Sequence, residues 1–279
     1  MPTYSTMEND QRRMRFRIPF ETVSHYPVPC MWRIEPLKTL LSLTMLFVLT
    51  AAAALSLHAD SLSVHDYLAA IREKYEQIED YQCRMNEFSI GGGRREERII
   101  NYYFKKPLLI RIDILDSNKR LDRGSVGVYT GGEKVTGHRG GLMQGMVLSV
   151  KKDSPFAVSV RGESIDKSNV LTVIERMERL VKMGTVDVDV NENHVEFVFI
   201  PFDMHANEGI SRDVVWIERD TFLITRIERY EGEKLVQQAI REGYIINAGL
   251  PKELFDAGFD TKQLKDSGIP LLSNDLSDM

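Results

Sequence analysis

Short runs of alternating apolar and polar residues constrain the fold of this chain more than any other feature. In one run Ile110, Ile112 and Ile114 share a face, and turn-forming residues separate it from the runs on either side. A period of two predicts strands with one buried face, and short strands joined by tight turns are typical of antiparallel sheets. The runs cover residues 81–85, 98–104, 108–114, 126–129, 134–138, 186–190, 195–200, 214–218, 222–230 and 234–240.

Two segments have the spacing of amphipathic helices instead. The first begins at Ser63, where Asp66 three residues later resembles a capping box, and continues towards Tyr81. The second covers residues 166–183, and Gly184 follows it as a stop signal. Because these helices are inserted into a series of strands, a doubly wound parallel sheet is disfavoured. We predict an α+β, mainly antiparallel protein: a curved sheet with helices against its inner face.

An uncharged apolar segment, Thr39–Leu57, lies near the N-terminus. Arg33 and Lys38 precede it and small residues end it, which is the layout of a secretory signal. We expect export to the periplasm and cleavage near Ala59, with an uncleaved membrane anchor as the alternative.

This interpretation divides the chain into four parts. Residues 1–30 do not fit a signal and are expected to be untranslated, with translation starting at Met31, or disordered. Residues 31–59 form the expected signal peptide and 60–255 a single domain. Residues 256–279 are polar and short of apolar anchors, so we expect a loose C-terminal tail.

Composition and motifs indicate a protein without catalytic groups. The 41 acidic and 36 basic residues give a net charge of −5, which argues against a nucleic-acid partner. The histidines are scattered, and the sequence has neither an HExxH motif nor a GxSxG elbow. Cys83 lies in an alternating run, where a small core residue is expected. We expect no enzyme activity, no metal and no cofactor; a hydrolase using a carboxylate or His205 is the weaker alternative.

The strands carry a surplus of apolar side chains. These side chains either form an ordinary core under the helices or line a partly open cavity that accepts an acyl chain. The candidate cavity residues are Ile110, Ile112, Ile114, Val126, Val128, Phe197, Phe199, Trp216, Phe222 and Ile224.

Four sequence phrases, in this order, resemble the LolA/LolB-like superfamily of periplasmic lipoprotein carriers. They are YFKKPLLIRI at 103–112, YTGGEKV at 129–135, VWIERDTFLITRIE at 215–228 and NAGLPKELF at 247–255. The resemblance extends over about residues 63–255 and is greatest to an uncharacterised LolA-like branch.

The resemblance implies an unclosed half-barrel of about 8–11 strands, with helices covering its concave face and an apolar cavity for lipid. Lys106 stands where these carriers have a basic residue that latches the helical lid, although a lysine lacks the planar fork of an arginine. The segment 140–184 departs from the carriers, so lipoprotein transfer itself does not carry over.

The sequence therefore predicts an exported, non-enzymatic protein that binds lipid or an acylated lipoprotein, with an envelope membrane protein as a further partner. The alternative is an envelope sensor or protein-interaction module on the same fold.

Overall fold

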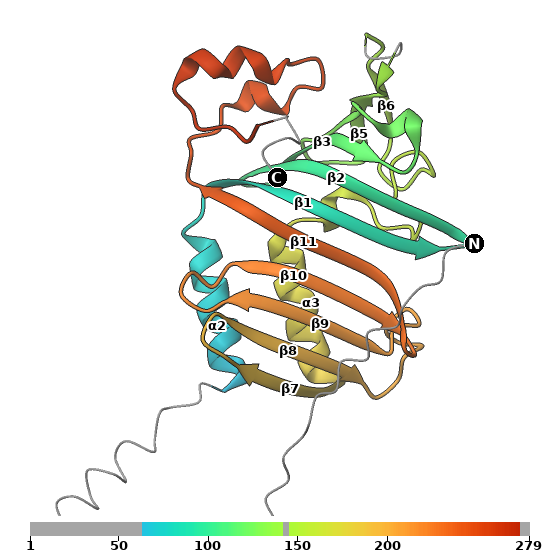
Figure 1. Ribbon diagram of the computed structural model, residues 1–279, viewed down its shortest axis with the longest axis vertical. Helices are drawn as coiled ribbons and strands as arrows, with labels where there is room; N and C mark the ends of the chain where they lie inside the picture. Colours follow the sequence, from blue (N-terminus) through green and yellow to red (C-terminus); the bar gives the residue numbers. More distant parts are fainter. Residues whose placement is uncertain (1–62, 142–144, 274–279) are drawn as a thin grey trace, which may run out of the picture. The chain divides into compact units, whose positions relative to one another are not determined.

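The computed structural model describes residues 63–141 and 145–273, which contain one antiparallel sheet of eleven strands (Figure 1). The predicted signal peptide and the untranslated segment lie outside these residues. The strands are β1 (Asp80–Gly91), β2 (Arg94–Lys105), β3 (Leu109–Ser117), β4 (Val126–Tyr129), β5 (Lys134–His138), β6 (Leu148–Lys151), β7 (Gly184–Val190), β8 (His194–Pro201), β9 (Arg212–Glu218), β10 (Ile224–Glu231) and β11 (Lys234–Ile246).

The sheet is open, and its two edges are consecutive strands in the sequence. The strand order is β6-β5-β4-β3-β2-β1-β11-β10-β9-β8-β7, and every neighbouring pair is antiparallel. β6 and β7 therefore stand at opposite edges, and the chain between them has to cross the sheet. The predicted fold class, an α+β half-barrel that is not closed, is confirmed.

Both predicted helices form, but their ends differ from the prediction. α2 (Val64–Glu76) has the expected capping box of Ser63 and Asp66 and stops before Tyr81. α3 (Val170–Met183) starts later than expected because Asn169 caps it by accepting a hydrogen bond from the Thr172 amide. The residues just before this cap form the short 3₁₀ helix η3 (Ile165–Lys167).

Gly184 ends α3, although not as a left-handed cap. Its backbone is extended and already belongs to β7. A Cβ atom at this position would lie 2.2 Å from the carbonyl oxygen of Ile200 on β8, so a glycine is needed where the helix turns into the edge strand.

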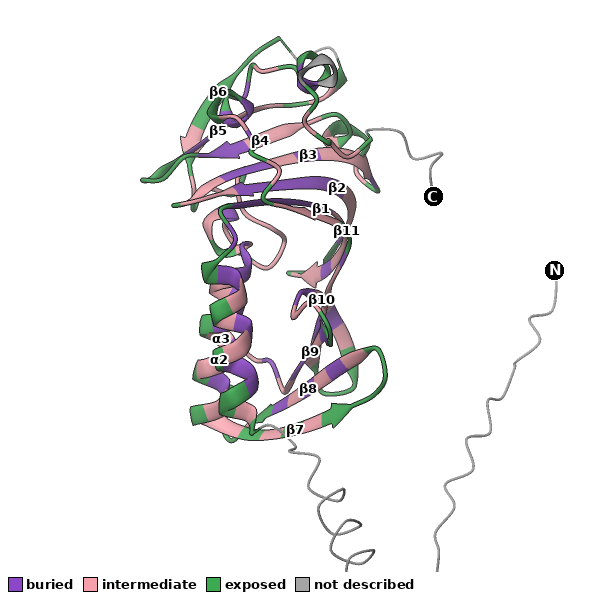
Figure 2. Ribbon diagram, turned by 90° about the vertical axis from the view of Figure 1, so that its left-hand side faces the viewer, coloured by how far each residue is buried: buried purple, intermediate pink, exposed green. Residues whose placement is uncertain are grey.

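The main core lies between the two helices and one face of the sheet, which we call the inner face (Figure 2). α3 buries Ile174, Met177 and Leu180 in this core. Tyr67 of α2 meets Phe197 of β8 edge to face, with ring centroids 5.8 Å apart. Close packing of this kind contributes beyond the area that it buries.

A second, smaller core lies on the outer face and includes part of the segment that was predicted to be a loose tail. Leu254, Ala257 and Leu264 are buried there together with Tyr103 of β2. Arg111 of β3 fixes this segment, because its Nη1 donates to the carbonyl oxygens of residues 254, 256 and 259 at 2.9–3.1 Å. Hydrogen bonds from a charged guanidinium are stronger than those between neutral groups, so they can hold this segment on the sheet although it has few apolar residues. The short helices here are η4 (Lys252–Phe255) and η5 (Thr261–Ser267).

Replacing Phe197 tests whether the helices cover a packed core. Phe197→Ala leaves a hole in a fully buried site, so we expect a loss of about 3–5 kcal/mol in the free energy of unfolding. Phe202→Ala changes an exposed phenylalanine and should alter stability by no more than about 0.5 kcal/mol. Urea denaturation of both variants measures this, and a loss below about 1 kcal/mol for Phe197→Ala would contradict a packed core.

Candidate functional site

The described residues enclose a cavity of about 780 Å³. It lies between the inner face of the β1–β6 half of the sheet and the segment 155–168, which follows β6 and forms its roof. Much of its wall is apolar. The apolar residues that line it include Ile112, Ile114, Val126, Val135, Leu148, Val150, Phe156, Ala157 and Ile165.

One side of the cavity is a ladder of paired charges. Arg98 of β2 lies 2.7 Å from a carboxylate oxygen of Glu87 and 3.8 Å from one of Glu96. The Lys119 ammonium lies 2.7 Å from the other Glu96 oxygen. Burial raises the pKa of Glu96, but Arg98 and Lys119 outweigh this effect and hold the pKa below its ordinary value. The ladder therefore presents hydrogen-bonding groups without an unpaired carboxylate.

The roof is attached to the β1–β2 hairpin. The Val160 amide donates to Glu96 Oε2 at 3.4 Å, and Arg161 Nη1 donates to the Ile90 carbonyl oxygen at 2.9 Å. A Cβ atom on Gly91 would lie 2.4 Å from the Val160 carbonyl oxygen. The glycine therefore allows the roof to approach the strand closely.

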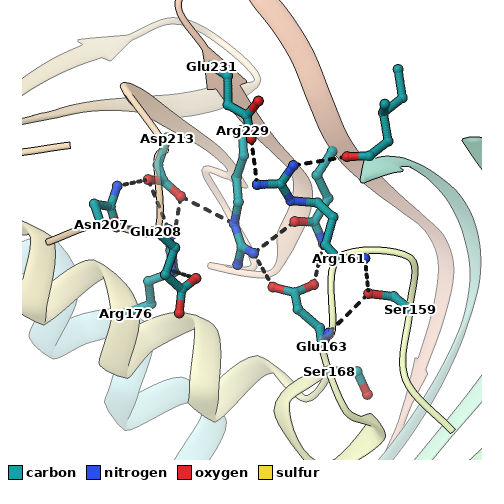
Figure 3. Close-up of polar contacts among 12 residues, drawn as sticks. Ser159, Arg161, Glu163, Ser168, Arg176, Asn207, Glu208, Asp213, Arg229 and Glu231 are labelled. Atoms are coloured by element: carbon teal, nitrogen blue, oxygen red, sulfur yellow. Dashed lines mark hydrogen bonds and ion pairs between the residues drawn. The ribbon is translucent and has the colours of Figure 1, made fainter. Parts of the chain in front are cut away.

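A buried polar network ties the roof to the helical half of the molecule (Figure 3). Glu163 of the roof pairs with Arg229 of β10. Arg229 Nε lies 3.3 Å from Asp213 Oδ1 on β9, and Arg176 Nε of α3 donates to the same oxygen at 3.0 Å. Asn207 donates to the other Asp213 oxygen at 3.0 Å. One chain of ion pairs thus connects the roof, the sheet and α3.

A buried arginine holds the end of the roof where it enters α3. Arg241 of β11 is 5% exposed and pairs with no carboxylate in the part of the chain that the structure describes. Its Nη2 lies 3.5 Å from the Ser168 carbonyl oxygen. Ser168 in turn donates its hydroxyl to Tyr102 at 3.1 Å. Of these residues Ser168 lines the cavity, so the junction borders it.

Three of the ten predicted cavity residues lie together. Ile112, Ile114 and Val126 line the cavity on the adjacent strands β3 and β4, and Val126 also packs against the outer cluster. Their role in binding a ligand stays a prediction.

The other seven residues lie elsewhere. Ile110, Phe197, Phe199 and Ile224 are fully buried in the main core, and Phe222, with a φ of 57°, packs against it. Two more are not part of that core. Val128 belongs to the outer cluster, and the ring of Trp216 is covered by the Arg226 guanidinium, 4.7 Å from the ring centroid.

Sequence reasoning missed the cavity residues on β6 and in the roof. Leu148 and Val150 alternate and could have indicated a further strand in the segment that departs from the carriers. Phe156 and Ile165 have no periodic partners, so no pattern marked them.

Lys106 contacts the helix that it was expected to latch. Its Nζ donates to the carbonyl oxygen of Glu76, the last residue of α2, at 2.6 Å, and lies 3.7 Å from a Glu79 carboxylate oxygen. A cation at the C-terminal end of a helix interacts favourably with the helix dipole. Whether this contact acts as a latch stays a prediction.

The described residues also bear on the expectations for metal binding and for Cys83. Within 63–141 and 145–273, no three His, Cys, Asp or Glu side chains are grouped so that they could hold a metal ion. Cys83 is buried, as expected for a core residue, and burial raises the pKa of its thiol to about 12. A thiol with this pKa is not a nucleophile at neutral pH. Of the helices that the structure describes, none is both long and apolar enough to span a bilayer.

No protein-family model matches the chain, and no curated protein matches it in sequence. Among solved structures, it is similar to a putative outer membrane lipoprotein-sorting protein domain from Vibrio parahaemolyticus, with 12% identity and a TM-score of 0.36 over 68% of this chain and 95% of that one.

Two further solved structures are similar at the same level. A LolA superfamily protein from Nitrosomonas europaea has 9% identity and a TM-score of 0.32, over 68% of this chain and 97% of that one. A chain of the MucA/MucB complex from Pseudomonas aeruginosa has 13% identity and a TM-score of 0.36, over 69% of this chain and 60% of that one. Likeness at this level carries no argument about function, which has to be argued from this chain's own residues.

Glu163 makes the attachment of the roof dependent on pH. Burial raises its pKa, but Arg229 and Gln237 together outweigh burial, so the pKa lies below the ordinary value of 4.5. The ion pair therefore stabilises the fold above pH 4.5, and this contribution disappears as the pH falls through the lower folded pKa. We expect Glu163→Gln to lower the free energy of unfolding by about 1–2 kcal/mol at pH 7, and by progressively less as the pH falls below 4.5.

Chemical denaturation at a series of pH values measures this difference. Glu231→Gln is the matched control, because Glu231 pairs with Arg161 of the same roof but its side chain is 46% exposed. Exposed pairs contribute little, so this variant should lose less than about 1 kcal/mol. A loss in Glu163→Gln that is the same at pH 7 and pH 3 would contradict the account.

Proposed function

We propose that this chain is an exported, non-enzymatic periplasmic protein that binds the acyl chain of a lipid or lipoprotein in the cavity under the roof. The observation that carries the proposal is the cavity itself. Its volume of about 780 Å³ falls within the roughly 300–1,000 Å³ of ligand-binding pockets, and its apolar wall suits a hydrocarbon.

The apolar wall of the cavity determines the free energy of such binding. Each methylene group that leaves water contributes about 0.8 kcal/mol, so an acyl chain needs only part of its length in the cavity to bind. Ile114, Val135 and Ile165 provide apolar contacts from the sheet and from the roof. The Glu87–Arg98–Glu96 ladder provides donors and acceptors to a polar head group.

Export supports a carrier of this kind. The apolar segment Thr39–Leu57 has the layout of a signal, and we propose that residues 31–59 are removed near Ala59. A lipid carrier in an envelope compartment keeps acyl chains out of water without a catalytic group.

A protein-interaction module is the second candidate. Ile200, Phe202 and Met204 are exposed near β7, an edge strand with unpaired backbone groups. Edge strands of this kind can pair with an added strand of a partner. This candidate predicts a protein that carries no lipid.

Bound lipid distinguishes the two candidates. Mass spectrometry of an organic extract from the protein purified out of a periplasmic fraction should find acyl lipid close to stoichiometric amounts. Ile114→Glu places a charge in the apolar wall and should remove most of this lipid.

The matched control makes the same change outside the cavity. Ile200→Glu alters an exposed isoleucine on β8 and should leave the lipid content unchanged. A lipid-free wild-type protein would contradict the carrier proposal. An equal loss of lipid in Ile114→Glu and Ile200→Glu would contradict it as well.

A further inference from the structure

Exposed apolar side chains gather beside the cavity. Phe156 and Leu148, which line the cavity, are 79% and 53% exposed. Leu121 is 71% exposed, and in the sequence it stands between the lining residues Lys119 and Asp122. Val147 is 46% exposed, and in the sequence it stands between the lining residues Met146 and Leu148. Large exposed apolar side chains that cluster in this way mark sites of contact with a protein or a membrane.

The accessible charge at the cavity is positive. Among the lining residues, Arg94 and Lys167 are exposed cations without a carboxylate partner in the described residues, and Arg139 is an exposed cation that pairs with Asp122. No lining carboxylate is equally exposed in the described residues, and each one has a cation partner. The pairs are Glu87–Arg98, Glu96–Lys119, Asp122–Arg139 and Glu163–Arg229. This local surplus of cations stands out in a chain whose net charge is −5.

We propose that this face, built on Leu121, Val147, Leu148 and Phe156, docks on the surface of an anionic phospholipid membrane. The apolar side chains enter the boundary between head groups and acyl chains, and the cations contact anionic head groups. The proposal rests on the proposed acyl-binding function, because docking brings the cavity to the source of its ligand. Continuity between the exposed side chains and the apolar wall favours a lipid surface over a protein partner.

The position of the side chains in the fold fits insertion into a membrane surface. Leu121 lies in the short helix η1 (Arg120–Asp122), Val147 precedes β6, and Phe156 lies in the turn after β6. All three belong to short connections and not to a flat sheet face. Side chains on such short connections can enter the head-group layer without disrupting the hydrogen bonds between strands.

Sedimentation of the purified full chain with vesicles tests the proposal. The chain should bind vesicles of phosphatidylcholine and phosphatidylglycerol about tenfold more tightly than vesicles of phosphatidylcholine alone. The preference should fall as salt is raised from 50 to 500 mM, because salt screens exposed charges.

A double variant shows whether this face makes the contact. Leu121→Ser/Val147→Ser should weaken binding to the anionic vesicles about tenfold. The control is Phe202→Ser/Met204→Ser, whose side chains are 78% and 48% exposed and do not line the cavity; it should bind as wild type. Neither Leu121 nor Val147 lines the cavity, so the double variant should still take up a fluorescent fatty acid from solution.

Other outcomes overturn the proposal. Equal vesicle binding by wild type and both double variants would locate the contact elsewhere in the chain, for example in Thr39–Leu57. A wild-type chain that takes up fatty acid but does not sediment with anionic vesicles would contradict docking and leave the acyl-binding function standing. A chain that sediments with vesicles but takes up no fatty acid would contradict the acyl-binding function instead.

Discussion

The path of the chain from β6 to β7 is the constraint on which the rest of the structure depends. These strands are consecutive in the sequence but stand at opposite edges of eleven strands, a distance of roughly 48 Å along a flat sheet. The 14 residues of α3 span only about 21 Å. The residues before the helix therefore have to cross the remaining strands in an extended or turning path.

This crossing divides the inner face into two parts with different packing. The helical part presents a regular apolar stripe, including Ile174, Met177 and Leu180, and fills the space against the sheet. The non-helical part, residues 152–168, contains serines and a glycine in its turns and has few large apolar side chains. It covers the strands without filling the space below it. The Glu163–Arg229 pair fixes this cover to the sheet, and the cavity lies beneath it.

The sequence predicts the elements of this fold better than it predicts the site. Alternation located every strand except β6, and helical spacing located α3, because both patterns are local. Alternation does not say which face of a strand is covered by helices, by the roof or by the C-terminal segment. Trp216 and Val128 therefore seemed equivalent to Ile114, although Trp216 packs against Arg226 and Val128 packs in the outer cluster. The positions of Phe156 and Ile165 depend on how the chain crosses the sheet between β6 and β7, and no local sequence pattern predicts them.

The most direct test of this account is the location of the acyl chain. A crystal structure of the protein with a fatty acid brominated along its chain would reveal the bromine by its anomalous scattering. The account predicts a bromine peak under the roof, in contact with Ile112, Ile114 or Ile165. A peak between α2 or α3 and the sheet, among the side chains around Phe197, or no peak at all, would contradict it.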